Sequence, residues 1–132
     1  MPIDNDFKTP QSAQELALPG HDKAPLFLAF VSSVGSDTGL PWCPDVRAAL
    51  PVLQAVFTKS EAPKLGIVGV GQKPEWREPG NIYRTKWNVS NVPTLVRYER
   101  RDGKVIEIGR LIEGEILVPE KLSKLLGYTS SL

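Results

Sequence analysis

The chain has 132 residues, 41% hydrophobic and 23% charged, which is the size and composition of one globular domain with a buried core, over residues 1–132. Sixteen basic residues nearly balance fifteen acidic ones, and no basic run is interleaved with aromatic residues, so we expect no nucleic-acid partner. The sequence contains no signal-like N-terminus and no apolar stretch of membrane-spanning length, so we expect a soluble protein without a membrane partner.

The first half of the chain predicts a short helix, a strand, a long loop and a long helix. A short helix is expected around residues 12–18, and the continuous apolar run 26–31 indicates a buried central strand. Residues 32–41 are too polar and glycine-rich for either element and predict a loop. From Pro44 onward, apolar residues recur every three or four positions, as in a helix with one buried face. These residues are Val46, Ala49, Leu50, Leu53, Val56 and Phe57.

The second half predicts a strand, a short helix, a hairpin and a last helix. Proline and glycine residues separate these segments, and Gly127 predicts the end of the last helix. Pro51, inside the long helix, predicts a kink there. In chain order we expect a buried strand at 65–70, a polar loop carrying Trp76 at 71–80, a helix at 82–87, hairpin strands at 94–99 and 105–108 around the turn 101–103, and an amphipathic helix at 119–126.

Cys43, the only cysteine, lies where the long loop meets the long helix. At a helix start, unpaired N–H groups and the positive end of the helix dipole favour the thiolate, which is the nucleophilic form of cysteine. The alternative is a buried, inert thiol, since free cysteine is among the most buried residue types. We favour the nucleophile. Because one cysteine cannot form an internal disulfide, the chain also fits the reducing cytoplasm.

Three motifs in order resemble a known family. Residues 42–45 read Trp-Cys-Pro-Asp, residues 70–79 read Val-Gly-Gln-Lys-Pro-Glu-Trp-Arg-Glu-Pro, and residues 92–95 read Val-Pro-Thr-Leu. They resemble the small thioredoxin domain-containing proteins of the cytosolic disulfide-reductase type, whose active site reads Trp-Cys-Pro-Asp-Cys. The resemblance implies an α/β thioredoxin-like fold with a central mixed β-sheet flanked by helices. Pro51 falls where thioredoxins keep a helix-kinking proline.

The resemblance also implies roles for particular residues. Cys43 would be the attacking thiol, Pro93 a cis-proline beside it, and the backbone of Val92 an edge that binds an extended substrate. Asp45 would handle a proton, although a carboxylate in the first helical turn also stabilises the helix electrostatically. The remaining substrate-binding candidates are aromatic or imino residues that could instead serve packing alone. They are Trp42, Pro44 and Trp76.

Two positions depart from this family or from thioredoxins at large. Val46 stands where the family has its second active-site cysteine, so the step in which that cysteine expels the product is lost. The strand before the loop carries Ala29 where ordinary thioredoxins have a buried acid. The sequence leaves open whether Val46 is native or was introduced to trap a complex.

Two functions follow as hypotheses. The first is a monothiol oxidoreductase of the protein-disulfide reductase type, acting through Cys43 on protein disulfides, glutathione adducts or nitrosothiols, with glutathione or a reductase system resolving the mixed disulfide. The second is a redox-inactive protein-binding module that uses the same groove. We expect no cofactor and no metal, because one cysteine, scattered acids and His21, interpreted as a surface loop residue, lack ligand spacing. A Cys43-linked dimer stays open.

Overall fold

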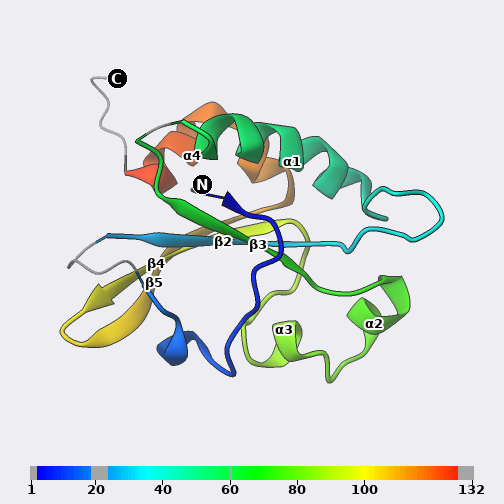
Figure 1. Ribbon diagram of the computed structural model, residues 1–132, viewed down its shortest axis with the longest axis horizontal. Coiled ribbons are helices and arrows are strands. Elements are labelled where there is room, and N and C mark those ends of the chain that lie inside the picture. Colours follow the sequence, from blue (N-terminus) through cyan, green and yellow to red (C-terminus); the bar gives the residue numbers. More distant parts are fainter. Residues whose placement is uncertain (1–2, 19–23, 60, 128–132) are drawn as a thin grey trace.

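A mixed sheet of five strands forms the centre of the molecule, with helices on both of its faces (Figure 1). The computed structural model describes residues 3–18, 24–59 and 61–127. The sheet has the order β1-β3-β2-β4-β5, and the predicted α/β architecture with a central mixed sheet is confirmed. The strands are β1 Ile3–Asp4, β2 Leu26–Val31, β3 Lys64–Gly69, β4 Thr94–Arg101 and β5 Lys104–Ile112.

The central strand β2 is buried along its whole length, as its apolar sequence predicts. It pairs in parallel with β3, where Ala29 lies opposite Ile67, and antiparallel with β4, where Ala29 lies opposite Leu95. A strand covered on both faces has no alternating polar side, which explains the unbroken apolar run. The loop that follows β2 therefore begins at the end of the central strand, which is held by a neighbouring strand on each side.

The helix α1 (Pro44–Phe57) packs its predicted apolar face onto this sheet. Val46, Ala49, Leu53 and Phe57 are buried, and the Phe57 ring meets Phe27 of β2 edge-on at 5.2 Å. The helix continues through Pro51, which lies on the exposed side. The buried residues run from Val46 in the first turn to Phe57 at the end of the helix, so α1 is held against the sheet along its whole length.

The predicted polar loop at 71–80 is wrong in part, because it contains the helix α2 (Lys73–Arg77). The carboxylate of Glu75 accepts a hydrogen bond from the Gln72 N–H at 2.8 Å, so a capping interaction starts this short helix. The next helix, α3 (Ile82–Thr85), ends before the predicted residue 87. Trp87 follows α3 and is buried in the core.

The predicted hairpin is confirmed, with both strands longer than expected. The strands β4 and β5 are joined by a two-residue turn in which Asp102 has a φ of 53° and Gly103 a φ of 77°. Such a turn matches the twist of the strands it connects, and glycine adopts positive φ without strain. At the start of β5, the side-chain amide of Gln14 donates to the Val105 carbonyl at 2.6 Å and accepts from the Val105 N–H at 3.2 Å.

The N-terminal segment differs from prediction. The helix expected at 12–18 is a single 3-10 turn, η1 (Ala13–Glu15), since only these residues have helical geometry. The strand β1 was not predicted, and it pairs in parallel with β3 through Ile3 opposite Leu65. Two residues are too short for a periodic pattern, so tertiary pairing alone defines this strand.

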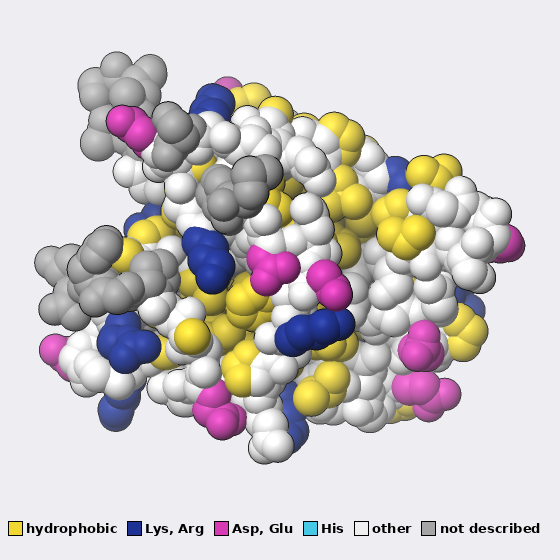
Figure 2. Space-filling model, viewed as in Figure 1, with side chains coloured by type: hydrophobic (Ala, Val, Ile, Leu, Met, Phe, Trp, Pro, Cys, Tyr) yellow, Lys and Arg dark blue, Asp and Glu magenta, His cyan; other side chains and the backbone are white. Residues whose placement is uncertain are grey.

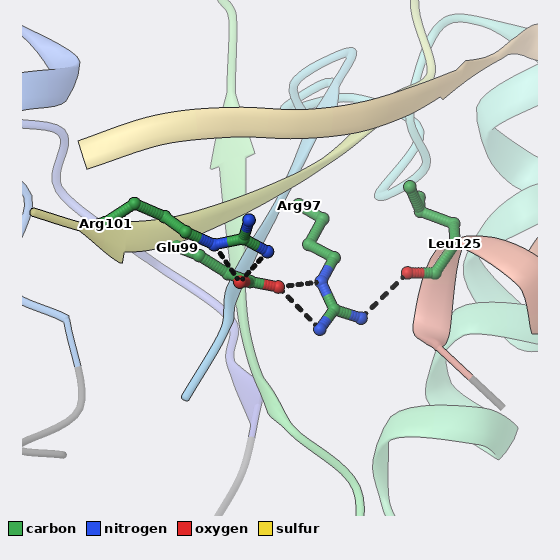
Figure 3. A network of polar contacts seen from close by, with 4 residues as sticks. All are labelled: Arg97, Glu99, Arg101 and Leu125. Carbon is green, nitrogen blue, oxygen red and sulfur yellow. Dashed lines mark hydrogen bonds and ion pairs between the residues drawn. The ribbon is translucent and has the colours of Figure 1, made fainter. Parts of the chain in front are cut away.

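The last helix, α4 (Pro119–Leu126), ends as predicted at Gly127, whose φ is 85°. A polar network joins this end to β4 (Figure 3). Glu99, whose side chain is 4% exposed, forms ion pairs with Arg97 at 2.7 Å and Arg101 at 2.9 Å, and Arg97 donates to the Leu125 carbonyl at 3.0 Å. Burial raises the pKa of the Glu99 carboxyl, but hydrogen bonds from both arginines outweigh it and leave this pKa below its ordinary value.

The helices in the described ranges and the charged side chains of the surface agree with the composition of the sequence. Every helix there is too short or too polar to cross a bilayer. Positive and negative side chains are interspersed over the face shown in Figure 2, in keeping with the nearly balanced charge of the sequence.

Candidate active site

Cys43 lies at the junction of the loop after β2 with α1. Its N–H donates to the hydroxyl of the buried Ser32 at 3.2 Å, and its carbonyl accepts the N–H of Val46 and of Arg47 at 3.1 and 3.2 Å. Cys43 is therefore the residue that caps α1, and Pro44 holds the first helical position. Proline suits that position because its missing N–H would have no helical partner.

The long loop before Cys43 is held against the chain that follows β3. The indole of Trp42 donates to the Gly71 carbonyl at 3.0 Å, and the Gly71 N–H donates to the Ser33 hydroxyl at 2.9 Å. Gly71 has a φ of 107°, a conformation that other residues rarely adopt. Within the loop, the Gly35 N–H donates to the Leu40 carbonyl at 2.9 Å. The polar loop before Cys43 is therefore held in one conformation by hydrogen bonds within itself and to Gly71.

A cis peptide bond joins Val92 to Pro93, as the resemblance implies. The Cys43 Sγ lies 3.7 Å from the Val92 carbonyl oxygen, a distance at which a thiol makes a weak hydrogen bond. The Pro93 carbonyl accepts the N–H of Glu113 at 2.8 Å, so the chain after β5 packs against the same loop. The half-buried thiol and the cis-proline loop are therefore direct neighbours.

A groove of about 270 Å³ opens beside the thiol. Its walls come from the start of α1, from α2 and α3, from the cis-proline loop and from the 3-10 helix η2 (Glu113–Leu117). The lining residues are Trp42, Cys43, Lys73, Trp76, Arg77, Arg84, Ser90, Asn91, Val92 and Glu113.

The groove brings together four of the predicted site residues and leaves out three. The four that line it are Trp42, Cys43, Trp76 and Val92. The three outside it are Pro93, which is buried, and Pro44 and Asp45, which are exposed on the first turn of α1. Asp45 is therefore placed to stabilise the helix start by its charge, and its role in proton handling stays a prediction.

Trp76 joins α2 to α3 and forms part of the groove wall. Its ring is 6% exposed, and the Arg84 guanidinium lies 4.0 Å from the ring centroid. The Arg84 Nε donates to the Trp76 carbonyl at 2.6 Å. Stacking and hydrogen bonding together fix the arginine, so both alternatives for Trp76 apply: it anchors the segment and lines the groove.

The charged members of the groove were missed by sequence reasoning. Lys73 and Arg77 come from α2, Arg84 from α3 and Glu113 from η2. The first two flank Trp76 within the motif at 70–79, and Lys73 precedes it by one helical turn. That spacing was the available signal, but it required α2 to be recognised as a helix.

Position 46 faces the core. Val46 is fully buried, one helical turn after Cys43, and the sequence provides no second cysteine. Ala29, at the position of the buried acid of ordinary thioredoxins, is fully buried between apolar neighbours on β3 and β4. Cys43 therefore has neither a resolving thiol nor a carboxylate at these two positions.

Other parts of the described structure offer less chemistry. A larger recess of about 500 Å³ lies between β4, β5 and α4, but its arginines Arg97 and Arg101 are already paired with Glu99. In the described ranges, no cluster of three His, Cys, Asp or Glu residues could hold a metal ion. His21, interpreted from the sequence as a surface loop residue, lies outside the described residues.

Comparison with known proteins connects this arrangement to one family. The sequence model of the thioredoxin domain of thioredoxin domain-containing protein 17-like proteins matches residues 6–123. A thioredoxin domain-containing protein of Schizosaccharomyces pombe is 39% identical over 101 residues, covering 76% of this chain and 82% of the relative. The thioredoxin-like protein Clot of Arabidopsis thaliana is 33% identical over 103 residues, covering 76% and 74%.

The fold agrees with these sequence matches. The structure of Trichomonas vaginalis thioredoxin superimposes with a TM-score of 0.61 and 13% identity, covering 93% of this chain and 96% of that one. At this identity the likeness concerns the fold alone, while the family match rests on sequence. The chain thus has a thioredoxin-like fold and belongs to the thioredoxin domain-containing protein 17-like family.

Proposed function

We propose that this chain is a thioredoxin-type redox protein that works with one thiol, as a monothiol oxidoreductase on disulfides, glutathione adducts or nitrosothiols. The observation that carries the proposal is the position of Cys43, half-buried at a groove and 3.7 Å from the Val92 carbonyl of the cis-proline loop, with the fully buried Val46 at the second cysteine position. The family membership supports redox chemistry in general, and Val46 limits it to one thiol.

The reaction on a disulfide has three exchange steps. The Cys43 thiolate attacks one sulfur of the substrate; a bond forms between Sγ and that sulfur, the substrate S–S bond breaks, and the other sulfur leaves as a thiolate that takes up a proton. An external thiolate then attacks Sγ of the mixed disulfide, so that the substrate sulfur leaves as a thiolate and the external sulfur is bound to Sγ. A second external thiolate attacks that external sulfur, forms the external disulfide and releases Cys43 as a thiolate. The net result is a reduced substrate and an oxidised external thiol pair, so electrons balance without a second cysteine in the chain.

The external thiol is the partner this proposal requires. Glutathione or a reductase-linked thiol protein supplies it, and we propose the cytoplasm as the compartment because thiols are kept reduced there. Helix-start geometry supports the nucleophile, since Cys43 lies at the positive end of the dipole of α1.

The test uses reduced protein, a glutathionylated peptide and glutathione. We expect release of the peptide thiol above the rate of glutathione alone, with a Cys43-peptide or Cys43-glutathione adduct visible by mass spectrometry, and loss of both in a Cys43→Ser variant. Urea unfolding of the variant checks that it is folded. Equal release with wild type and variant would refute the proposal.

A second candidate is a binding module in which the thiol is incidental, and the specific observation that favours it is the replacement of the resolving cysteine by Val46. In that case a protein partner occupies the groove without covalent chemistry. Partner binding that is undiminished in Cys43→Ser, together with no thiol exchange in the assay above, would support this candidate over the first.

A further inference from the structure

The groove beside Cys43 carries an excess of positive charge. Lys73, Arg77 and Arg84 line it, and Glu113 is the one carboxylate among its lining residues. Within the described part of the chain, the ion pairs involve other residues, so these three cations are not neutralised by a salt bridge there. The thiol therefore opens onto a surface whose fixed charges favour an anion.

The three cations differ in how firmly the structure holds their side chains, and this decides which of them can adjust to a bound anion. Arg84 is fixed by its stacking on Trp76 and by its bond to the Trp76 carbonyl. Lys73 and Arg77 are exposed on α2 and can adjust to a bound molecule. The carboxylates close to them in the sequence, Asp45, Glu75 and Glu78, are not among the lining residues of the groove, and Glu75 accepts the Gln72 N–H.

Glu113 lies on the cis-proline side of the groove. Its N–H donates to the Pro93 carbonyl at 2.8 Å, and its φ of 51° places it in the left-handed region. The backbone of this residue is thereby tied to the loop that carries Val92. The groove is thus lined by three cationic side chains from α2 and α3 and by one carboxylate from η2.

We propose that the groove selects disulfides flanked by carboxylates, as found in an acidic peptide segment, and that Lys73 and Arg77 determine this preference. This inference rests on the proposed function and adds the substrate class to it. An acidic segment lying along the groove brings its carboxylates toward the cations of α2, and the groove field also raises the rate of encounter. The bonds formed and broken are those of the first exchange step above.

The experiment compares two peptide disulfides that differ only in charge. The probes are the symmetrical disulfides of the capped peptides Glu-Cys-Glu and Gln-Cys-Gln, and the readout is the rate of the Cys43 adduct measured by mass spectrometry at low and high salt. Each rate is divided by the rate of the same disulfide with a small neutral thiol, which removes differences in intrinsic sulfur reactivity. The corrected Glu to Gln ratio is the measure of selectivity.

We expect a ratio above one at low salt that falls toward one as salt screens the charges. A single exposed cation contributes roughly a 1.4- to fivefold effect, so the double variant Lys73→Gln, Arg77→Gln should lower the ratio by about that factor or more. The matched control is Lys59→Gln, Lys64→Gln, which removes the same charge at exposed positions outside the groove and should leave the ratio unchanged. Glu113→Gln should raise the ratio.

The outcomes separate this inference from the proposed function. If both peptides form the Cys43 adduct with a corrected ratio of one, the charge preference is refuted while the redox function stands. An equal fall of the ratio in the groove and control variants also refutes it, because net charge alone would then explain the effect. If neither peptide forms an adduct, the proposed function fails and this inference fails with it.

Discussion

Replacing the buried carboxylate of Glu99 by an amide should destabilise the fold. The side chain of Glu99 is 4% exposed and accepts from one arginine on each carboxylate oxygen (Figure 3). Glu99→Gln removes the negative charge and turns one of these oxygens into an NH2 donor that faces an arginine donor. Breaking a buried ion pair costs about 3–5 kcal/mol. Arg97 is 15% exposed but Arg101 is 51% exposed, so water compensates for part of the loss. We therefore expect a decrease in the free energy of unfolding of roughly 2–3 kcal/mol.

Urea unfolding followed by tryptophan fluorescence measures this change. With a urea dependence of about 1–3 kcal/mol per molar for a small protein, the midpoint should fall by roughly 1–2 M at pH 7. The pH dependence follows from the lowered pKa of Glu99. A carboxyl with a lower pKa in the folded state stabilises the fold above its unfolded pKa of about 4.3, and this stabilisation is lost as pH falls through the folded value.

The difference between wild type and Glu99→Gln should therefore be full near neutrality and narrow below about pH 4.3. Glu107→Gln is the control, because Glu107 pairs with Arg110 but has a side chain that is 37% exposed. That variant should lose no more than about 1 kcal/mol. A Glu99→Gln variant as stable as the control at pH 7, or a gap that stays constant into acid, would refute the reasoning.

Three further variants test the surroundings of the thiol and the end of α4. Val46→Cys places a second thiol one turn from Cys43, so the reduced variant should fully reduce one disulfide per chain without an external thiol and show no free thiol afterwards in a denaturing titration; two free thiols after this reaction would contradict the prediction. Ser32→Ala removes the acceptor of the Cys43 N–H and should lower the free energy of unfolding by about 1–3 kcal/mol in urea; unchanged stability would contradict the importance of this bond. Gly127→Ala puts a Cβ at a φ of 85° and 2.9 Å from Arg97 Nη1, which should lower the free energy of unfolding by about 1–2 kcal/mol and lower the melting temperature accordingly. An unaltered melting temperature would contradict this prediction.

The elements that the sequence predicted well are those with long, regular patterns. The six apolar residues of β2 and the spaced apolar residues of α1 report burial directly, and the order of three motifs indicated the thioredoxin-like fold. The neighbourhood of Cys43 and the cis bond before Pro93 followed from the same motifs.

What the sequence missed depends on short elements and long-range contacts. The helix α2 has five residues, too few for periodicity to reveal, and β1 exists only through its pairing with β3. Without α2, nothing in the sequence could place Lys73 in the groove beside Cys43. Glu113 reaches the same groove through the long-range bond of its N–H to the Pro93 carbonyl. The sequence therefore predicted Cys43 as the candidate nucleophile but not the charged residues that line the groove beside it.

The amide of Gln14 has a consequence for how copies of the chain meet. The strand β5 is one of the two edge strands of the sheet, and its Ile106 and Ile108 are each more than one third exposed, so another strand could add to this edge. Gln14 bonds both the N–H and the carbonyl of Val105 and so occupies the positions that an added strand would use there. The side chain of Gln14 thus blocks the addition of a strand from another copy at Val105, near the start of β5.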